Sequence, residues 1–455
     1  MSRKGEGNLR AFVRTLGCPK NEVDSERFRG VLSRAGYDRA PSPEEADLLL
    51  LNTCAFIEPA VRESLDALRE AVSWRKRSPG RRLVLAGCLP GRYPPGPGER
   101  PEGVDLVAGP GDTASLEAYL GLFPAGRDLL LPEGSLYSRF LKISDGCDNA
   151  CSYCTIPLIR GPYRGIRPDA IRESADQLVR QGAVEIGLVG QDTGRWSFEG
   201  MSLTDLLATL SEEHGDVWWR LYYVHPSHLP PGLLELMTAR SNVVPYLDLP
   251  IQHASDHVLR RMGRPYTESR LRSLLERVGN CETLIAVRLT VMVGYPGESD
   301  RDFQTLLDFL GDFDCIRNLV VFRYYPEEGT REHSQGRELP GPAVVSDRLA
   351  DVEALSEFFS AEWATRLSGK ELKVVVDGPR EGHCMYDAPF VDGRCLFDRA
   401  VSAPGRLRAE VMDFRGNDIL VRPVIEDDSM GELESEPSSP ANSGDTSPGE
   451  VSCLP

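Results

Sequence analysis

Three cysteines stand close together in the segment GCDNACSYC, at Cys147, Cys151 and Cys154. A structural zinc site needs a fourth ligand, but the next histidine along the chain is as distant as His214. A redox role for the last two cysteines alone would leave Cys147 without a function. Three thiolates suit a four-iron, four-sulfur cluster in which one iron stays free of protein ligands. Such an iron can coordinate a substrate or a cofactor.

Three further cysteines share another pattern, because each ends an apolar run typical of a buried strand. RAFVRTLGC ends at Cys18, DLLLLNTC at Cys54 and RLVLAGC at Cys88. The helical stretches SERFRGVLSRAGY and PAVRESLDALREAVSWRKR separate these runs. Strands that alternate with helices predict a doubly wound parallel sheet, whose strands end at one ligand crevice. We therefore expect these thiols to meet in space; the alternative is three separate buried thiols.

A second series of strands and helices follows a Pro/Gly-rich stretch over residues 90–103 and a boundary near residues 125–138. Six strand patterns run from RFLKISDGC to NLVVFRYYP, with helical patterns between them. This alternation predicts a complete or partial TIM-like barrel, with its active site at the carboxyl ends of the strands. The cysteine triplet lies just after the first strand. A long helix over residues 343–368 and a small β-barrel are expected to follow.

Composition limits the class of protein. The chain has 455 residues and a formal net charge of −17, and its length predicts several domains. It has neither an export signal nor an apolar run long enough to cross a bilayer, so we expect a cytoplasmic protein without membrane contact. The segment from Glu426 onward is acidic and is predicted to be disordered. The lack of a basic excess argues against attraction to nucleic-acid phosphates and favours a basic or neutral partner.

The cysteine segments resemble a known family. Cys147, Cys151 and Cys154, with Tyr153 before the last cysteine, resemble the motif of radical S-adenosylmethionine enzymes. TLGCPKNEVDSE, NTCAFI and AGCLPGRY resemble the three amino-terminal cysteine segments of the methylthiotransferases. DGCDNACSYCTIPLIRGPYR, YLDLPIQHASDHVLRRMGR and VGYPGES resemble the central barrel of that family. The resemblance covers about residues 9–425; it departs at Gly165, where serine is common, and in the acidic tail.

The resemblance implies a three-part α/β fold. Its parts are an N-terminal methylthiotransferase domain over residues 8–125, a radical S-adenosylmethionine barrel of six strand-helix units over 136–368, and an all-β TRAM domain over 369–426. Residues 427–455 form the acidic tail. The resemblance also implies two 4Fe-4S clusters with three cysteine ligands each. These ligands are Cys147, Cys151 and Cys154 for the barrel cluster, and Cys18, Cys54 and Cys88 for the auxiliary cluster.

The implied reaction uses two molecules of S-adenosylmethionine in each turnover. One methylates a sulfur held at the auxiliary cluster, and the other is cleaved to the radical that activates the substrate carbon. An external sulfur source and a reductant are needed, with flavodoxin or ferredoxin as the type of electron donor. Beyond the cluster ligands, no catalytic residue is implied.

Several other residues are candidates for cofactor or substrate contacts. The resemblance places Tyr153 near the adenine of S-adenosylmethionine, and Gln191 and Asp192 near its methionine end. The alternative for the last two is a capping or turn role. His225 and His228, with Pro226 between them, are candidates for substrate contact, and a structural role for these histidines is equally open.

Two classes of this family differ in substrate. One modifies a tRNA adenosine next to the anticodon, and the other modifies an aspartate of the twelfth small-subunit ribosomal protein. CPKN in place of CQMN resembles the ribosomal class, as do YVHPSH, YLDLPIQHAS and MYDAPFVDG. Residues 369–428 hold nine basic and twelve acidic residues, which suits a basic protein better than tRNA. We therefore predict methylthiolation of the aspartate β-carbon. The alternatives are a tRNA adenosine methylthiotransferase and a non-catalytic iron-sulfur protein that binds RNA.

Overall fold

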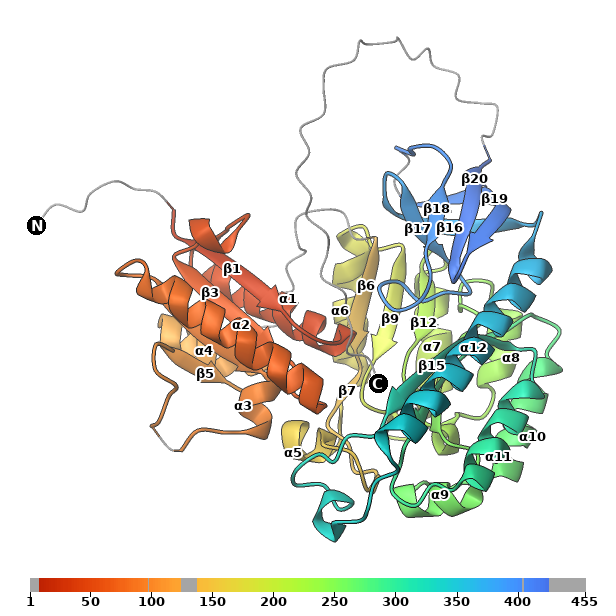
Figure 1. Ribbon diagram of the computed structural model, residues 1–455. Coiled ribbons are helices and arrows are strands. Elements are labelled where there is room, and N and C mark those ends of the chain that lie inside the picture. Colours follow the sequence, from red (N-terminus) through yellow and green to blue (C-terminus); the bar gives the residue numbers. More distant parts are fainter. Residues whose placement is uncertain (1–7, 97, 124–136, 403–404, 425–455) are drawn as a thin grey trace, which may run out of the picture.

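The computed structural model describes residues 8–96, 98–123, 137–402 and 405–424 (Figure 1). The tail predicted to be disordered, residues 427–455, lies outside them. Among the described residues, every helix is too short or too polar to cross a membrane.

The amino-terminal part is a five-stranded parallel sheet with strand order β2-β1-β3-β4-β5. Its strands are β1 (Arg10–Thr15), β2 (Asp38–Arg39), β3 (Leu48–Thr53), β4 (Arg82–Gly87) and β5 (Leu106–Ala108). Its helices are α1 (Pro19–Arg34), α2 (Glu58–Lys76), α3 (Cys88–Arg92) and α4 (Thr113–Leu120), with the 3₁₀ helix η1 at Pro43–Glu45. We call this unit the N-terminal sheet.

Helices cover both faces of this sheet, as the alternation predicted. Every residue of β3 is buried. Because side chains alternate along a strand, Leu48 and Leu50 pack in the cluster formed with α1 and α4. Leu49 and Leu51 pack on the other face against α2. The first four residues of the strand are leucines because neither face meets water.

The first helix begins earlier than its apolar pattern predicts. SERFRGVLSRAGY indicates a start at Ser25, but α1 begins at Pro19, with Cys18 at the N-cap position. Proline suits the first helical position because its missing N–H has no intrahelical partner there. The CPKN segment is therefore the amino-terminal turn of a helix and not a loop, which fixes the positions of Lys20 and Asn21.

Six parallel strands form the central barrel in the order β6-β9-β12-β13-β14-β15. A bridge between Trp219 and Val243 joins its two three-stranded halves. β6 and β15 do not pair, so the barrel of the described residues is open, as a partial TIM barrel is. The strands are β6 (Ser138–Lys142), β9 (Glu185–Val189), β12 (Trp218–Leu221), β13 (Tyr246–Gln252), β14 (Ala286–Val293) and β15 (Ile316–Arg323).

Helices surround the outside of the central barrel (Figure 1). They include α6 (Pro168–Arg180), α7 (Leu203–Glu213), α8 (Leu233–Ala239), α10 (Glu268–Gly279), α11 (Asp300–Gly311) and the predicted long helix α12 (Pro342–Leu367). Two short helices are α9 (Asp256–Met262) and α5 (Ile156–Arg160), and α5 lies beside α3 of the N-terminal sheet (Figure 1). Short elements are β7 (Ser144–Asp145), β8 (Arg164–Gly165), β10 (Ser197–Phe198), β11 (Met201–Ser202), η2 (Thr193–Arg195), η3 (Pro226–His228) and η4 (His333–Gln335).

The carboxyl-terminal strands close into a small barrel with the order β16-β17-β18-β20-β19. They are β16 (Glu371–Gly378), β17 (Glu381–Cys384), β18 (Cys395–Phe397), β19 (Arg406–Arg415) and β20 (Asp418–Pro423). The pattern of β17, EGHC, was not recognised as a strand because it lacks alternating β-branched residues. We call this unit the C-terminal barrel.

Buried ion pairs join the C-terminal barrel to the amino-terminal halves of the central strands. Asp387 pairs with Arg317 at 3.2 Å, and Asp392 pairs with Arg288 at 3.2 Å. The hydroxyl of Tyr246 also donates to Asp392 at 2.6 Å. Both aspartates belong to the segment MYDAPFVDG. This segment therefore anchors the C-terminal barrel at the end of the central barrel opposite the cysteine triplet.

His383 is a second buried contact between the two barrels. One ring nitrogen lies 3.0 Å from Glu185 and the other lies 2.7 Å from Asp377. Burial opposes protonation, but the charges of Glu185 and Asp377 outweigh it and raise the pKa of His383 to about 9. The folded state thus binds this proton more tightly than the unfolded chain does.

This linkage predicts a pH-dependent stability. The contribution of His383 is complete below its ordinary pKa of 6.5 and is lost as the pH rises through about 9. We expect the urea midpoint of the natural protein to fall across this window relative to that of His383→Gln, which has no such proton to lose. Tryptophan fluorescence during urea unfolding measures both midpoints. Two curves that stay parallel across the window would contradict the linkage.

Candidate active site

One cavity lies where the N-terminal sheet meets the carboxyl ends of the central strands. All six cysteines predicted to bind iron line it. The residues around them that the argument below uses are Lys20, Asn149, Tyr153, Arg160, Gln191, Tyr223, His225 and Arg264. We call this space the active-site cavity.

The first three cysteines reach the cavity because each follows a parallel strand. Cys18 comes after β1, Cys54 directly after β3 and Cys88 directly after β4. Gly17, with a φ of +91°, permits the close approach: a Cβ atom there would lie 2.8 Å from the Cβ of Cys54. Strand ends that are far apart in sequence thus bring three thiols to one edge of the sheet.

The cysteine triplet lies in the loop between β7 and α5. Gly146 lets the start of this loop pack closely against the segment that follows α5. A Cβ atom at this position would lie 2.1 Å from the carbonyl oxygen of Pro162. The amide of Ser152 donates to the carbonyl oxygen of Met262 at 2.8 Å, which ties the loop to the end of α9. The amide of Asn149 donates to the sulfur of Cys147 at 3.4 Å. The loop is thereby fixed before any ligand binds.

The electrostatic surroundings of the thiols fit iron-sulfur clusters. All six are free thiols. Burial raises the pKa of Cys88 and of Cys147. Burial and the neighbouring Cys151 raise the pKa of Cys154 to about 12. Thiolates in this cavity are favoured by a positive partner, and iron would supply that charge. The number and convergence of the thiols fit iron-sulfur ligation.

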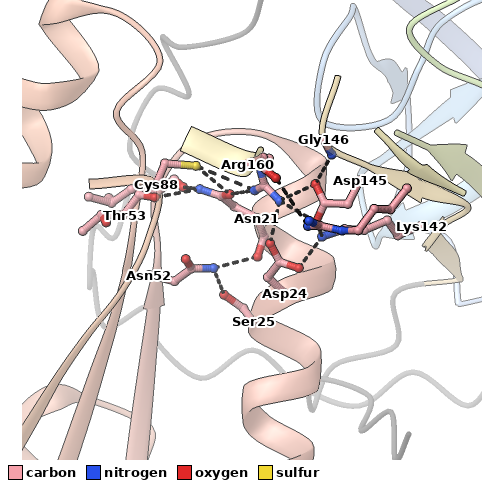
Figure 2. Close-up of polar contacts among 12 residues, drawn as sticks. Asn21, Asp24, Ser25, Asn52, Thr53, Cys88, Lys142, Asp145, Gly146 and Arg160 are labelled. Carbon is pink, nitrogen blue, oxygen red and sulfur yellow. Dashed lines mark hydrogen bonds and ion pairs between the residues drawn. The ribbon is translucent and has the colours of Figure 1, made fainter. Parts of the chain in front are cut away.

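Arg160, the last residue of α5, contacts side chains of α1, the loop before the triplet and Cys88 (Figure 2). It donates to Asp24 at 3.1 Å and to Asp145 at 3.2 Å. Its other terminal nitrogen donates to the side-chain oxygen of Asn21 at 2.7 Å and lies 3.7 Å from the sulfur of Cys88. One guanidinium thus holds the first turn of α1, the loop before the triplet and an auxiliary cysteine together.

Asn21 completes this connection on the N-terminal side. Its amide donates to the carbonyl oxygens of Leu16 at 2.8 Å and Thr53 at 3.0 Å, at the ends of β1 and β3. The side chain of Asn52 in turn donates to the backbone oxygen of Asn21 at 2.8 Å. Asn21 is fully buried, so each of these polar groups needs its partner.

Further ion pairs hold α1 against the first barrel strand. Lys142 pairs with Asp24, and Arg139 pairs with Glu26. All four side chains are buried. Near the other end of the contact, Glu327 accepts from the backbone amide that begins α2 at 2.7 Å. The N-terminal sheet and the central barrel therefore meet through charged side chains that exclude water.

Two predicted cofactor residues line the cavity. The hydroxyl of Tyr153 accepts hydrogen bonds from Arg264 at 2.5 and 3.1 Å. In the amide orientation that satisfies its neighbours, the oxygen of Gln191 accepts from Arg160 at 3.0 Å. Both side chains are thus held by buried arginines. Their position is compatible with the cofactor contacts that the family resemblance implies.

Unlike Gln191, Asp192 does not face the active-site cavity. It is buried and accepts from His228 at 2.6 Å and from Asn149 at 2.8 Å. It does not cap the short helix η2 that follows it. Asp192 therefore reaches the cavity only through Asn149, which lines it.

Of the two histidines predicted to contact the substrate, only His225 lines the cavity. It is also the N-cap residue of η3, where its Nδ1 accepts a hydrogen bond from the amide of Ser227 at 3.2 Å. Burial and the charge of Arg264 lower the pKa of His225 to about 3, so its ring is neutral. Pro226 and His228 do not line the cavity.

Sequence analysis missed six residues of this site. They are Lys20, Asn21, Asn149, Arg160, Tyr223 and Arg264. CPKN and YVHPSH were recognised only as resemblances, and nothing local indicates which of their side chains face a cavity. A signal for Tyr223 appears only in the backbone, where its φ of +57° is unusual for a bulky residue.

Comparisons with known proteins agree with this architecture. Residues 10–109 match the uncharacterized protein family UPF0004, and residues 141–310 match the radical SAM superfamily. Among solved structures, the radical S-adenosylmethionine methyltransferase TsrM from Kitasatospora setae aligns with a TM-score of 0.51 at 14% identity. The alignment covers 69% of this chain and 73% of TsrM, and it shows a shared fold. Fold and site define a radical S-adenosylmethionine enzyme.

Curated relatives narrow this class. The ribosomal protein uS12 methylthiotransferase RimO of Desulforudis audaxviator is 40% identical over 422 residues, which cover 87% of this chain and 92% of that protein. RimO of Anaeromyxobacter sp. (strain Fw109-5) is 35% identical, with coverage of 92% and 94%. The chain belongs to the RimO family of ribosomal protein uS12 methylthiotransferases.

The network around Arg160 predicts a large loss of stability in Arg160→Met. In this variant the carboxylates of Asp24 and Asp145 lose the guanidinium that pairs with them. Breaking a buried ion pair typically lowers the free energy of unfolding by about 3–5 kcal/mol. Because Lys142 still contacts both carboxylates, we expect the lower end, about 3 kcal/mol. Urea unfolding of the metal-free protein measures it.

Arg172→Met provides the matched control. This arginine pairs with Glu213 on the outer surface and its side chain is 51% exposed, so we expect a change within about 0.5 kcal/mol. If both variants unfolded at the same urea concentration, the Arg160 network would not stabilise the contact between the two units.

Proposed function

We propose that this enzyme attaches a methylthio group to the β-carbon of an aspartate in ribosomal protein uS12. The observation that carries the proposal is the convergence of two three-cysteine sets on one cavity. The names of the curated relatives support this substrate and not tRNA adenosine. They also argue against the alternative of a non-catalytic RNA-binding protein.

The two cysteine sets have separate tasks in this proposal. Each set would hold one 4Fe-4S cluster through three thiolates. When bound, one cluster supplies the electron for cleavage of S-adenosylmethionine and the other holds the sulfur to be transferred. The chain's own side chains position the reactants: Arg264 fixes the ring of Tyr153, and Arg160 fixes the amide of Gln191.

The remaining assignments follow from the same family membership. We assign the methylthiotransferase domain to residues 8–125, the radical barrel to 136–368 and a TRAM domain to 369–426, which includes the C-terminal barrel. A cytoplasmic location fits a ribosomal substrate. A flavodoxin or ferredoxin would deliver electrons, and an external sulfur source would renew the transferred sulfur.

Replacing one cysteine of each set separates the two tasks. We expect Cys151→Ala to abolish release of 5′-deoxyadenosine, and Cys54→Ala to retain that release while losing methylthio transfer. The natural protein should hold about eight irons per chain and each variant about four, because two thiolates retain a 4Fe-4S cluster poorly.

Cys281→Ala is the control for this experiment, since Cys281 lies away from the cavity among the barrel helices. Its iron content and both reactions should equal those of the natural protein. If Cys54→Ala lost both 5′-deoxyadenosine release and methylthio transfer, the result would argue against two separate clusters.

A competition experiment tests the substrate. The reconstituted enzyme receives uS12 and tRNA together with reductant, sulfide and S-adenosylmethionine. We expect mass spectrometry to find the methylthio group on an aspartate of uS12 and no modification in nucleosides from digested tRNA. A methylthiolated adenosine beside unmodified uS12 would refute the substrate and leave the radical chemistry standing.

A further inference from the structure

Lys20 is a buried cation of the active-site cavity that has no acidic partner among the residues the structure describes. Only 6% of this residue is exposed, and it lines the cavity beside the auxiliary cysteines. Across the part of the chain that the structure describes, no carboxylate forms an ion pair with its ammonium group. Its one specific contact is the ring of Tyr223, with Nζ 3.5 Å from the ring centroid.

The other two buried cations of the cavity differ from Lys20. Arg160 is neutralised by Asp24 and Asp145. Arg264 donates two hydrogen bonds to Tyr153. A buried ammonium group without a counter-ion is unfavourable, and an anionic ligand that enters the cavity would stabilise it. Lys20 is therefore placed to meet a negative group that enters the cavity.

Tyr223 supports the same conclusion independently. Its backbone is held at a φ of +57° by two hydrogen bonds: its amide donates to Asp248 at 3.0 Å, and its carbonyl oxygen accepts from Thr193 at 3.1 Å. Backbone strain of this kind is commonly retained at ligand sites. The Tyr223 hydroxyl is buried and has no hydrogen-bond partner among the described residues.

The first turn of α1 adds to the positive potential at this place. Lys20 is the second residue of a 16-residue helix whose N-cap side chain makes no capping hydrogen bond. The dipole of this helix favours an anion here. The charge of the lysine and the field of the helix therefore point to the same kind of ligand.

We propose that Lys20 and Tyr223 form the subsite that binds the side-chain carboxylate of the target aspartate. This inference rests on the proposed function. It gives a physical role to two motifs far apart in sequence, CPKN and YVHPSH, because the structure brings one residue of each into contact. An adenosine base carries no carboxylate, so it would leave the ammonium group unpaired. The subsite thus favours a protein substrate.

S-adenosylmethionine also carries a carboxylate, and the two sources must be distinguished. Lys20 lies on α1 two positions after Cys18, whereas the triplet that would bind S-adenosylmethionine lies on the barrel side of the cavity. The geometry therefore favours the substrate carboxylate. A third possible role, neutralisation of the auxiliary cluster, predicts a loss of iron when the lysine is removed.

The test compares two peptides that carry the target loop of uS12, one with the natural aspartate and one with asparagine in its place. Fluorescence anisotropy measures their binding to the reconstituted enzyme. We expect the natural protein to bind the aspartate peptide about tenfold more tightly or better, which is typical of a hydrogen bond to a charged group. In Lys20→Met the two peptides should bind equally, while Lys20→Arg should keep part of the preference. Lys76→Met, at an exposed ion pair with Glu102, is the control and should keep the full preference.

Iron content and the affinity for S-adenosylmethionine are measured on the same preparations. The inference holds if Lys20→Met loses the preference for aspartate and keeps both other values. It is overturned if that variant keeps the preference, loses about half of its iron, or binds S-adenosylmethionine more weakly. Failure of the natural enzyme to modify uS12 at all would instead refute the proposed function, and the binding preference would show separately whether the carboxylate subsite exists.

Discussion

The buried carboxylate of Asp24 is the contact on which the rest of the active site depends. It lies on α1 and pairs with Lys142 and Arg160, which come from the central barrel. A buried charge of this kind is stable only while its partners are in place, so any displacement of one unit against the other that separates these groups is costly. The docked arrangement sets the distance between the two cysteine sets. A looser, apolar contact would permit sliding and would leave the two sets without a fixed separation.

The cavity combines apolar burial with a few fixed charges. Burial raises the pKa of the thiols of Cys88 and Cys147. Arg160 is neutralised by Asp24 and Asp145, and Arg264 is held by two hydrogen bonds to Tyr153. Among the described residues, the side chain of Lys20 has neither an acidic partner nor a hydrogen bond, and its ammonium group lies over the ring of Tyr223. This difference separates the scaffold of the site from its binding groups.

The sequence predicted the parts of this structure that depend on local patterns. Buried strands such as β3 have a continuous apolar signal, and cysteines at their ends are placed by the rules of parallel sheets. Contacts between distant side chains have no such signal. Asn21 and Arg160 are far apart in the chain, and only the docking of α5 on α1 brings them together. Asp192 was expected beside the cofactor, and its bond to His228 could not be anticipated because it depends on the geometry of two loops.

The charge of the C-terminal barrel shows that a count of acidic and basic residues is a poor guide to the field at its surface. Its acidic balance suggested a basic partner, but Asp387 and Asp392 are almost fully buried and are neutralised by Arg317 and Arg288 of the central barrel. These carboxylates anchor the barrel and contribute little to the field that an approaching partner meets. Part of the acidic excess is therefore structural. Net charge alone is a weak argument for a ribosomal substrate; family membership and the unpaired ammonium group in the cavity are stronger ones, because each concerns the site where the substrate reacts.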